Sequence, residues 1–336
     1  MKNATDNKLT FDRKKTYLFF LDHIIEVCLI LLVIGLTLGA NRFFTWANWM
    51  NILRANSLKG VIAFGMTMVI ISGLIDLSIG STVGLSGVIV AMACRDLVAG
   101  GMDLNLACII GMFACIVLAI SIGWIHGFFQ HKTGMPAFIV TLASLYALLG
   151  LAGRLSGGFP IPNQFPEWYN ALGGGRIGGI DGIPIPTIIL LVSFLIIWFI
   201  MKFTTTGRST YAVGGNPESA RLSGINVGKI KIIVFIIVQV MAVISGFMTS
   251  GQVMSGSFTF GRGWELDVIA AVVVGGTSFT GGVGKVWGTL VGVIFMGVIS
   301  NGMTLLNFDI HTQYIVKAFI MFLAVLFSSY RARIKA

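Results

Sequence analysis

The sequence has 336 residues, of which 56% are hydrophobic and only 11% are charged, and its mean hydropathy is +0.90. Soluble domains carry roughly 25% charged residues, so the composition excludes a water-soluble enzyme or binding domain. The net charge of +10 does not indicate nucleic-acid binding, because no solvated basic patch with stacking aromatics accompanies it. Long apolar runs favour helices over a membrane β-barrel. The predicted fold class is therefore all-α, a polytopic membrane protein embedded in a lipid bilayer.

Residues 1–22 are polar and of mixed charge, and three basic residues, Arg13, Lys14 and Lys15, stand just before the first apolar run. No clear small-residue cleavage site follows that run, so we predict a cytoplasmic N-terminal tail rather than a signal peptide. Residues 23–336 are expected to form a single transmembrane domain.

Hydropathy predicts about ten transmembrane segments along the rest of the chain. They lie at residues 23–40, 60–74, 77–94, 104–129, 137–153, 185–201, 230–250, 265–277, 286–305 and 312–330. A connection rich in glycine and proline, residues 154–184, is predicted to be an outer linker. It divides the chain into two five-helix halves, residues 23–153 and 185–330.

Lysines and arginines are distributed unevenly between the loops on the two sides of these segments. With the N-terminus inside, fifteen fall on the inner side and seven on the outer side, Arg54 and Lys59 among the outer seven. Lys317 lies within the last segment. Because cytoplasmic loops carry the excess of positive charge, this distribution predicts that both termini are cytoplasmic.

Two of the segments, 60–74 and 265–277, are too short to cross a bilayer of about 30 Å at 1.5 Å per residue unless their neighbours complete the crossing. Each runs into a glycine-rich break, at residues 72–80 and 275–282. A short, interrupted segment in each half favours an internally repeated transporter with a solute pathway near the breaks. The alternative is that both breaks are ordinary cytoplasmic turns.

Three GxxxG pairs each place two glycines on one helix face, which favours close crossing by a second helix. These pairs are Gly80/Gly84, Gly123/Gly127 and Gly288/Gly292. They predict tight helix contacts and carry no information on the solute.

Four ionisable residues lie inside or at the ends of apolar segments, where an unpaired charge is costly. They are Asp76, Glu265, Asp267 and Lys317. Asp76 precedes Ser78 and either caps the segment that starts near residue 77 or contacts solute. Glu265 and Asp267 either stabilise the start of their helix or accept hydrogen bonds from a polyol. Lys317 is expected to snorkel or to pair with a carboxylate such as Asp309.

No motif in the sequence encodes a nucleotide, metal or catalytic site. Gly284 and Lys285 resemble the end of a P-loop. Phe279, however, replaces its first glycine, and Val286 replaces the Ser/Thr that binds magnesium. The four histidines, His23, His126, His131 and His311, are scattered along the chain and suggest neither a metal cluster nor a catalytic dyad. We therefore predict no cofactor and no enzymatic activity in this chain.

A polar inner loop, residues 202–229, separates two apolar segments. Asn216 is placed to cap a short helix that has Pro217 at its first position and Glu218 in its first turn, and Gly224 is placed to end it. A helix of about seven residues is marginal in water, so we expect it to dock. Its partner is either the protein's own helix ends or a soluble subunit.

Glu218, Ser219, Ala220 and Gly224 resemble the EAAxxxG loop of binding-protein-dependent ABC importer permeases, with Ser219 in place of the usual alanine. The resemblance to the ribose-type permeases extends over nearly the whole chain. Further matching stretches are Gly73–Ser81 (GGIDLSVGS, with Leu74 for the second glycine), Pro136–Leu142 (PxFIVTL), Gly214–Gly228 (GGNxxAAxxSGINV) and Trp264–Gly282 (ELDAIAAVVxGGTSxxGG).

The resemblance implies a permease subunit in a bacterial inner membrane, translocating a monosaccharide such as a pentose or hexose. Implied partners are a cytoplasmic ABC ATPase, an extracytoplasmic sugar-binding protein and a second permease copy, most simply as a homodimer. The implied ATPase-coupling residues are Asn216, Glu218, Ser219, Ala220, Arg221 and Gly224. Candidate pathway residues are Asn56, Phe64, Asp76, Ser78, Glu265, Asp267 and Thr277. An ion-coupled secondary transporter or channel remains the alternative.

Overall fold

The computed structural model describes residues 23–162 and 165–335, so the predicted tail at residues 1–22 lies outside the described residues. The helices before residue 163 are α2 (Ile24–Gly39), α3 (Trp46–Ile71), α4 (Ile79–Ala99), α5 (Leu104–Thr133) and α6 (Ala137–Leu155). Those after residue 164 are α7 (Glu167–Gly174), α8 (Ile185–Phe203), α9 (Thr205–Gly215), α10 (Pro217–Leu222), α11 (Val227–Val253), α12 (Trp264–Val274), α13 (Val286–Leu305) and α14 (Ile310–Lys335). The strands are β1 (Ile161–Pro162), β2 (Arg176–Ile177), β3 (Ile183–Pro184) and β4 (Ser255–Gly256).

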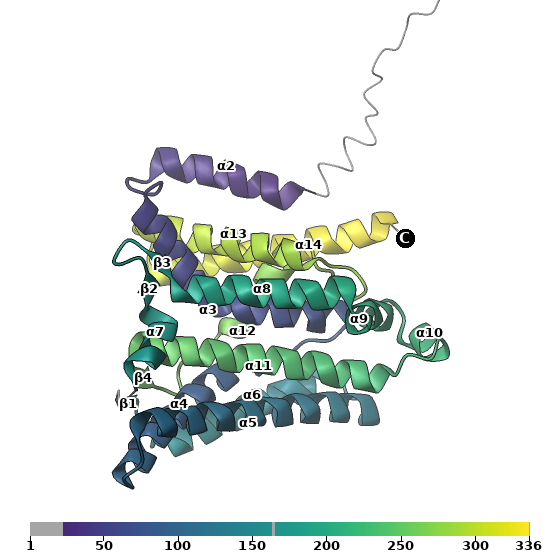
Figure 1. The fold of residues 1–336 in the computed structure, drawn as a ribbon. Helices are drawn as coiled ribbons and strands as arrows, with labels where there is room; N and C mark the ends of the chain where they lie inside the picture. The colour runs from purple at the N-terminus through teal and green to yellow at the C-terminus, as the bar shows by residue number, and fades with distance from the viewer. Residues whose placement is uncertain (1–22, 163–164, 336) are drawn as a thin grey trace, which may run out of the picture.

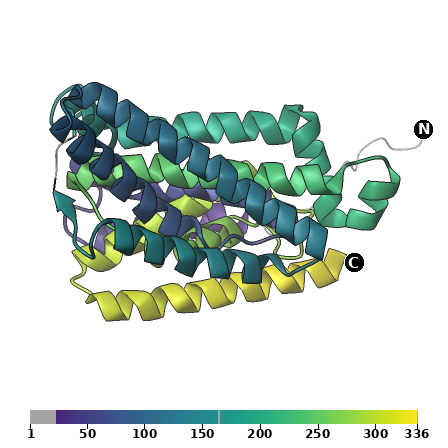
Figure 2. The same cartoon turned by 90° about the horizontal axis from the view of Figure 1, so that it is seen from below.

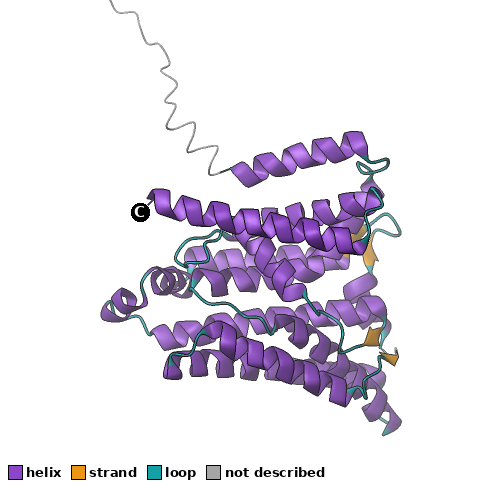
Figure 3. Ribbon diagram, turned by 180° about the vertical axis from the view of Figure 1, so that it is seen from behind, coloured by secondary structure: helices purple, strands orange, loops and turns teal. Residues whose placement is uncertain are grey.

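Most helices lie roughly parallel or antiparallel to one common axis and form a bundle (Figures 1 and 2). One end of the bundle carries α9, α10, the start of α2 and the C-terminal end of α14 (Figure 1). The opposite end carries α7 and the short strands, which pair as β1–β4 and β2–β3 (Figure 3). The all-α class is confirmed, because the strands in the described part of the chain have two residues each and close no sheet.

Seven helices among the described residues are long and apolar enough to cross a membrane, which confirms a polytopic membrane protein. They are α3, α4, α5, α6, α8, α11 and α13. Two further apolar stretches, Ile24–Gly39 and Ile310–Leu326, are shorter, and α12 has 11 residues. The count of about ten membrane segments therefore stays a prediction.

The first of the two short segments is longer than the sequence suggested. α3 begins at Trp46, where Thr45 caps it by accepting a hydrogen bond from the N–H of Asn48 at 3.3 Å, and it runs for 26 residues to the break. The polar residues in its first half lower the hydropathy there without breaking the helix. Arg54 and Lys59, assigned to an outer loop by the charge distribution, therefore lie inside α3. The second segment, α12, is short as predicted.

Close contacts occur at all three GxxxG pairs, with a second helix at two of them, as predicted, and with the turn before α12 at the third. Gly123 and Gly127 of α5 lie directly against the backbone of Ile236 and Ile232 in α11, so that a Cβ atom at either glycine would overlap it. Gly80 and Gly84 contact the chain between Phe258 and Gly261, while Gly288 and Gly292 contact the backbone of α12 and its C-cap Gly275. The small residues thus let α5 pack closely against α11, and α13 against α12.

The α5–α11 contact provides a stability prediction. We expect the double variant Gly123→Ala/Gly127→Ala to lose about 1–3 kcal/mol of stability per site, because each new methyl group overlaps the backbone of α11. Gly150→Ala in α6 is the matched control, since nothing lies within 4 Å of its added Cβ, and alanine favours a helix over glycine by about 0.5–1 kcal/mol. Thermal unfolding of the purified proteins measures the stability of the double variant and of the control. Equal midpoints for the two variants would contradict the close contact.

Candidate functional site

The polar loop at residues 202–229 forms two consecutive helices, α9 and α10. Asn216 lies between them, and its Oδ1 accepts a hydrogen bond from the N–H of Ser219 at 2.9 Å, with Pro217 at the first helical position. The helix ends in a turn in which Gly224 has φ +83° and donates its N–H to the carbonyl of Arg221 at 3.0 Å. The short helix predicted from these residues is therefore present, with six residues. The helix α9, which precedes it, was not predicted from the sequence.

Most of α10 faces outward. Ala220 is buried, whereas Leu222 is 75% exposed. Arg221 donates to Glu218 at 2.6 Å across one exposed helix turn, and its guanidinium lowers the pKa of the Glu218 carboxyl below its usual value. The helix therefore presents an apolar side chain and an ordered ion pair on a protruding element (Figure 1).

The end of α9 meets both glycine-rich breaks. The N–H of Gly282, in the break after α12, donates to the carbonyl of Ile71, the last residue of α3, at 2.8 Å. A Cβ atom at Gly214 of α9 would overlap that same carbonyl oxygen and would lie 2.7 Å from the N of Gly282. Tyr211 of α9 donates its hydroxyl to the carbonyl of Gly284 at 2.9 Å. We call this contact of Ile71, Gly214 and Gly282 the glycine junction. It links α9–α10 directly to both interrupted segments.

Asp76 lies in the first break and is completely buried. Its Oδ1 accepts hydrogen bonds from the backbone N–H and the hydroxyl of Ser78, at 2.8 and 2.7 Å. Its Oδ2 accepts from Nε2 of Gln239 at 2.8 Å. The carboxylate thus holds Ser78, the residue that precedes α4, although no side chain caps the helix itself.

Two residues of this buried cluster were missed by the sequence reasoning. His126 of α5 lies with Nδ1 3.5 Å from the Asp76 carboxylate, and its Nε2 shares a hydrogen bond of 2.7 Å with Ser144. Gln239 of α11 also accepts from the hydroxyl of Thr82 at 2.6 Å. The only signal in the sequence was the presence of polar residues in apolar segments, which does not show that they meet. Together the cluster connects α4, α5, α6 and α11.

Glu265 and Asp267 stand in the first turn of α12 but face different cavities. Glu265 lines a cavity of about 280 Å³ between α4, α6 and the chain before α12. Ser81, Tyr146 and Arg262 add hydroxyl and guanidinium groups to its wall, and Leu142 and Phe258 add apolar surface. Apolar walls with a few placed polar groups are typical of a small-molecule pocket.

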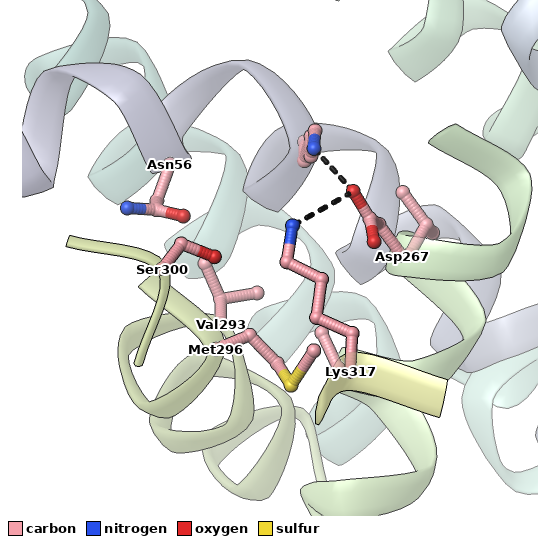
Figure 4. A pocket seen from close by; sticks show the side chains of 9 residues that line it. Asn56, Asp267, Val293, Met296, Ser300 and Lys317 are labelled. Atoms are coloured by element: carbon pink, nitrogen blue, oxygen red, sulfur yellow. Dashed lines mark hydrogen bonds and ion pairs between the residues drawn. The ribbon is translucent and has the colours of Figure 1, made fainter. Parts of the chain in front are cut away.

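Asp267 belongs to a smaller cavity of about 30 Å³, shown in Figure 4. Lys59 of α3 donates to its Oδ2, and Nζ of Lys317 lies 3.9 Å from the same oxygen. Asn56 lines this cavity as well. The suggested pairing of Lys317 with Asp309 is wrong. Asp309 instead accepts hydrogen bonds from the N–H groups of His311 and Thr312, at the start of its own helix.

The remaining candidate residues lie elsewhere. Phe64 is fully buried in the core, with its ring 5.6 Å from that of Phe194, and it lines none of the cavities described above. Thr277 is buried in the second break beside Gly284. The seven pathway candidates are therefore divided among the Asp76 cluster, the two cavities, the core and the break, and do not form one continuous surface in this chain.

Comparison with known proteins gives a consistent result. Residues 48–325 match the family described as the branched-chain amino acid transport system permease component. The ribose import permease protein RbsC of Escherichia coli (strain K12) is 40% identical over 89% of this chain and 90% of its own length. The RbsC of Bacillus subtilis (strain 168) is 38% identical, over 89% of each chain. The L-arabinose transport system permease protein AraH of E. coli (strain K12) is 33% identical, over 90% of this chain and 89% of its own. No solved structure matches significantly.

A bundle of helices long and apolar enough to span a membrane, with a protruding helical loop, defines the chain as a polytopic membrane protein. The chain belongs to the family of transport-system permease components, and its resemblance to ribose-type ABC importer permeases is confirmed. It is a multi-pass protein of the inner membrane. The relatives are permeases rather than catalytic enzymes, and they do not favour the secondary transporter or channel.

Proposed function

We propose that this chain is the membrane-spanning subunit of an ABC importer and translocates a monosaccharide, a ribose-like pentose or a hexose. The observation that carries the proposal is the protruding α10, whose sequence resembles the ATPase-coupling loop of such permeases, in a chain 40% identical to a ribose import permease. A short helix with an exposed leucine and an ordered ion pair suits the cleft of a cytoplasmic ATPase subunit. An extracytoplasmic sugar-binding protein would deliver the solute.

The composition of the two ends of the bundle supports an orientation of the protein in the membrane. The start of α2, the C-terminal end of α14 and the α9–α10 loop gather at one end (Figure 1). Placing that end in the cytoplasm agrees with the excess of lysine and arginine predicted there. In this arrangement α2 and α14 complete the membrane domain and α12 is a half-crossing segment, which gives ten segments in two halves.

A second copy of the chain is expected to complete the pathway. α6 buries few of its residues, and Phe138 and Tyr146 on it are exposed. The same helix forms one wall of the cavity that holds Glu265. If two α6 helices face one another in a homodimer, the two cavities border a shared space, and their hydroxyl and charged groups are suited to the hydroxyls of a sugar. Glu265 and Ser81 are the groups that we assign to this pathway.

The coupling role is tested by Glu218→Arg. This change places two cations together on α10 and removes the ion pair with Arg221, so we expect ATP-driven sugar uptake to fall at least about tenfold and the ATPase subunit to dissociate. The measurement is uptake into proteoliposomes that contain the permease, its ATPase and the binding protein, together with co-purification of the ATPase.

Lys132→Glu is the control, because it makes an equally large charge change at an exposed residue at the end of α5. It should transport normally. Sugar uptake by Glu218→Arg that equals the control, or uptake that persists without any ATPase, would overturn the proposal in favour of an ion-coupled transporter or channel.

A further inference from the structure

The cavity around Asp267 contains more positive than negative charge. The Nζ atoms of Lys59 and Lys317 both approach Oδ2 of Asp267, one as a hydrogen-bond donor and the other at 3.9 Å (Figure 4). Of the described side chains, no second carboxylate lies within ion-pair distance of either lysine. The three groups carry one net positive charge when both lysines are protonated.

The surroundings do not neutralise this charge. Asn56 and Ser300 are the polar neutral residues of the wall, and the rest of it is aliphatic or thioether surface from Val268, Ala271, Val293 and Met296. The ring of Trp264, 5.4 Å from Nζ of Lys59, attracts the ammonium but carries no charge. Glu265 lines the other cavity.

The position makes the excess charge costly. Lys59 lies in the middle of α3, and the side chains of Lys317, Asp267 and Lys59 are only 17%, 27% and 30% exposed. Ionisable groups at membrane depth are normally paired with an opposite charge. A single counter-ion in the cavity would supply the missing negative charge.

The cavity has room for a small ion. It encloses about 30 Å³, and a water molecule needs roughly 10–15 Å³ by this measure. The space therefore suits one monatomic anion and excludes a larger one such as gluconate. Both ammonium groups and the hydroxyl of Ser300 are hydrogen-bond donors that an anion can accept from, whereas the amide nitrogen of Asn56 donates to the carbonyl of Ile52 at 2.7 Å.

We propose that this cavity binds one small monovalent inorganic anion, of which chloride is the most abundant. The ion bridges Lys59 of α3, Lys317 of α14 and Ser300 of α13, while the two lysines also pair with Asp267 of α12. Its site is separate from the cavity assigned to the sugar. Its role is to hold α14 against the bundle.

The test compares the full-length permease in nanodiscs of zwitterionic lipid in sodium chloride and in sodium gluconate, at equal ionic strength. We expect the thermal midpoint in saturating chloride to be higher by about 2–4 °C. Radioactive chloride should bind saturably, with one ion per chain, and bromide should compete.

Lys59→Met and Lys317→Met each leave one lysine for one carboxylate. Both variants should lose the chloride dependence and the saturable binding while remaining folded in gluconate. Lys132→Met, which removes an exposed lysine far from the cavity, should keep both. Equal stability of the wild type in the two salts without saturable binding, or chloride binding that survives in Lys59→Met, would overturn the proposal.

Discussion

Replacing Asp76 with alanine is expected to prevent assembly of a stable permease. The carboxylate is completely buried and accepts hydrogen bonds from Ser78 and from Gln239, with His126 beside it. Alanine leaves the N–H and the hydroxyl of Ser78 without this acceptor, and each such loss costs about 1–3 kcal/mol, while Nε2 of Gln239 keeps only its hydrogen bond to Oγ of Ser78 at 2.8 Å. The sum is on the order of 3–5 kcal/mol, a large part of the roughly 5–15 kcal/mol by which proteins are stable. Fluorescence-detected size-exclusion chromatography of the solubilised protein measures the loss.

Two further variants separate the buried site from a general effect of losing a carboxylate. Asp103→Ala removes an exposed N-cap that accepts from the N–H groups of Asn105 and Leu106, and it should cost only about 1 kcal/mol. Asp76→Asn keeps one acceptor oxygen for Ser78 and should lie between the two. If Asp76→Ala were as well assembled as Asp103→Ala, the cluster would not hold α4, α5 and α11 together.

The helical architecture was largely predictable because the bilayer imposes it. A run of about 20 apolar residues must form a helix in lipid, and glycine pairs at helical spacing indicate close contacts. The start of α3 was not predictable in this way. Asn51, Arg54 and Lys59 lower the hydropathy of its first half, but Asn51 and Lys59 find partners outside the helix, in Arg176 and Asp267. Hydropathy does not register contacts of this kind.

In the candidate site, too, the features that depend on neighbouring residues were predictable and those that depend on long-range contacts were not. α10 was predictable because Asn216, Pro217 and Gly224 act within a few residues of each other. The Asp76 cluster was not, since Gln239 lies 163 residues from its acceptor. No local pattern indicates which polar residue of one apolar helix will face that of another. The glycine junction was missed for the same reason, because its three residues are far apart in the sequence and come together only in the folded protein.

That junction leads to a prediction about coupling. Gly214 stands where α9 touches the carbonyl of Ile71 and the N–H of Gly282. A methyl group there would overlap this carbonyl, so Gly214→Ala is expected to displace α9 from the two breaks. We expect ATP-driven sugar uptake to fall about tenfold or more, with ATPase binding retained, since α10 itself is unchanged. Reconstituted uptake and ATPase co-purification measure the two properties separately.

The neighbouring glycine is the matched control. Gly215 belongs to the same helix, yet nothing lies within 4 Å of the Cβ atom that alanine would add, so Gly215→Ala should transport like the wild type. The pair differs only in whether the new methyl group reaches the junction. Loss of uptake in Gly214→Ala alone would mean that motion of α10 passes through α9 to the breaks after α3 and α12. Equal activity of the two variants would mean that the coupling takes another route, for which α8 and α11, both directly continuous with the loop, are the remaining connections.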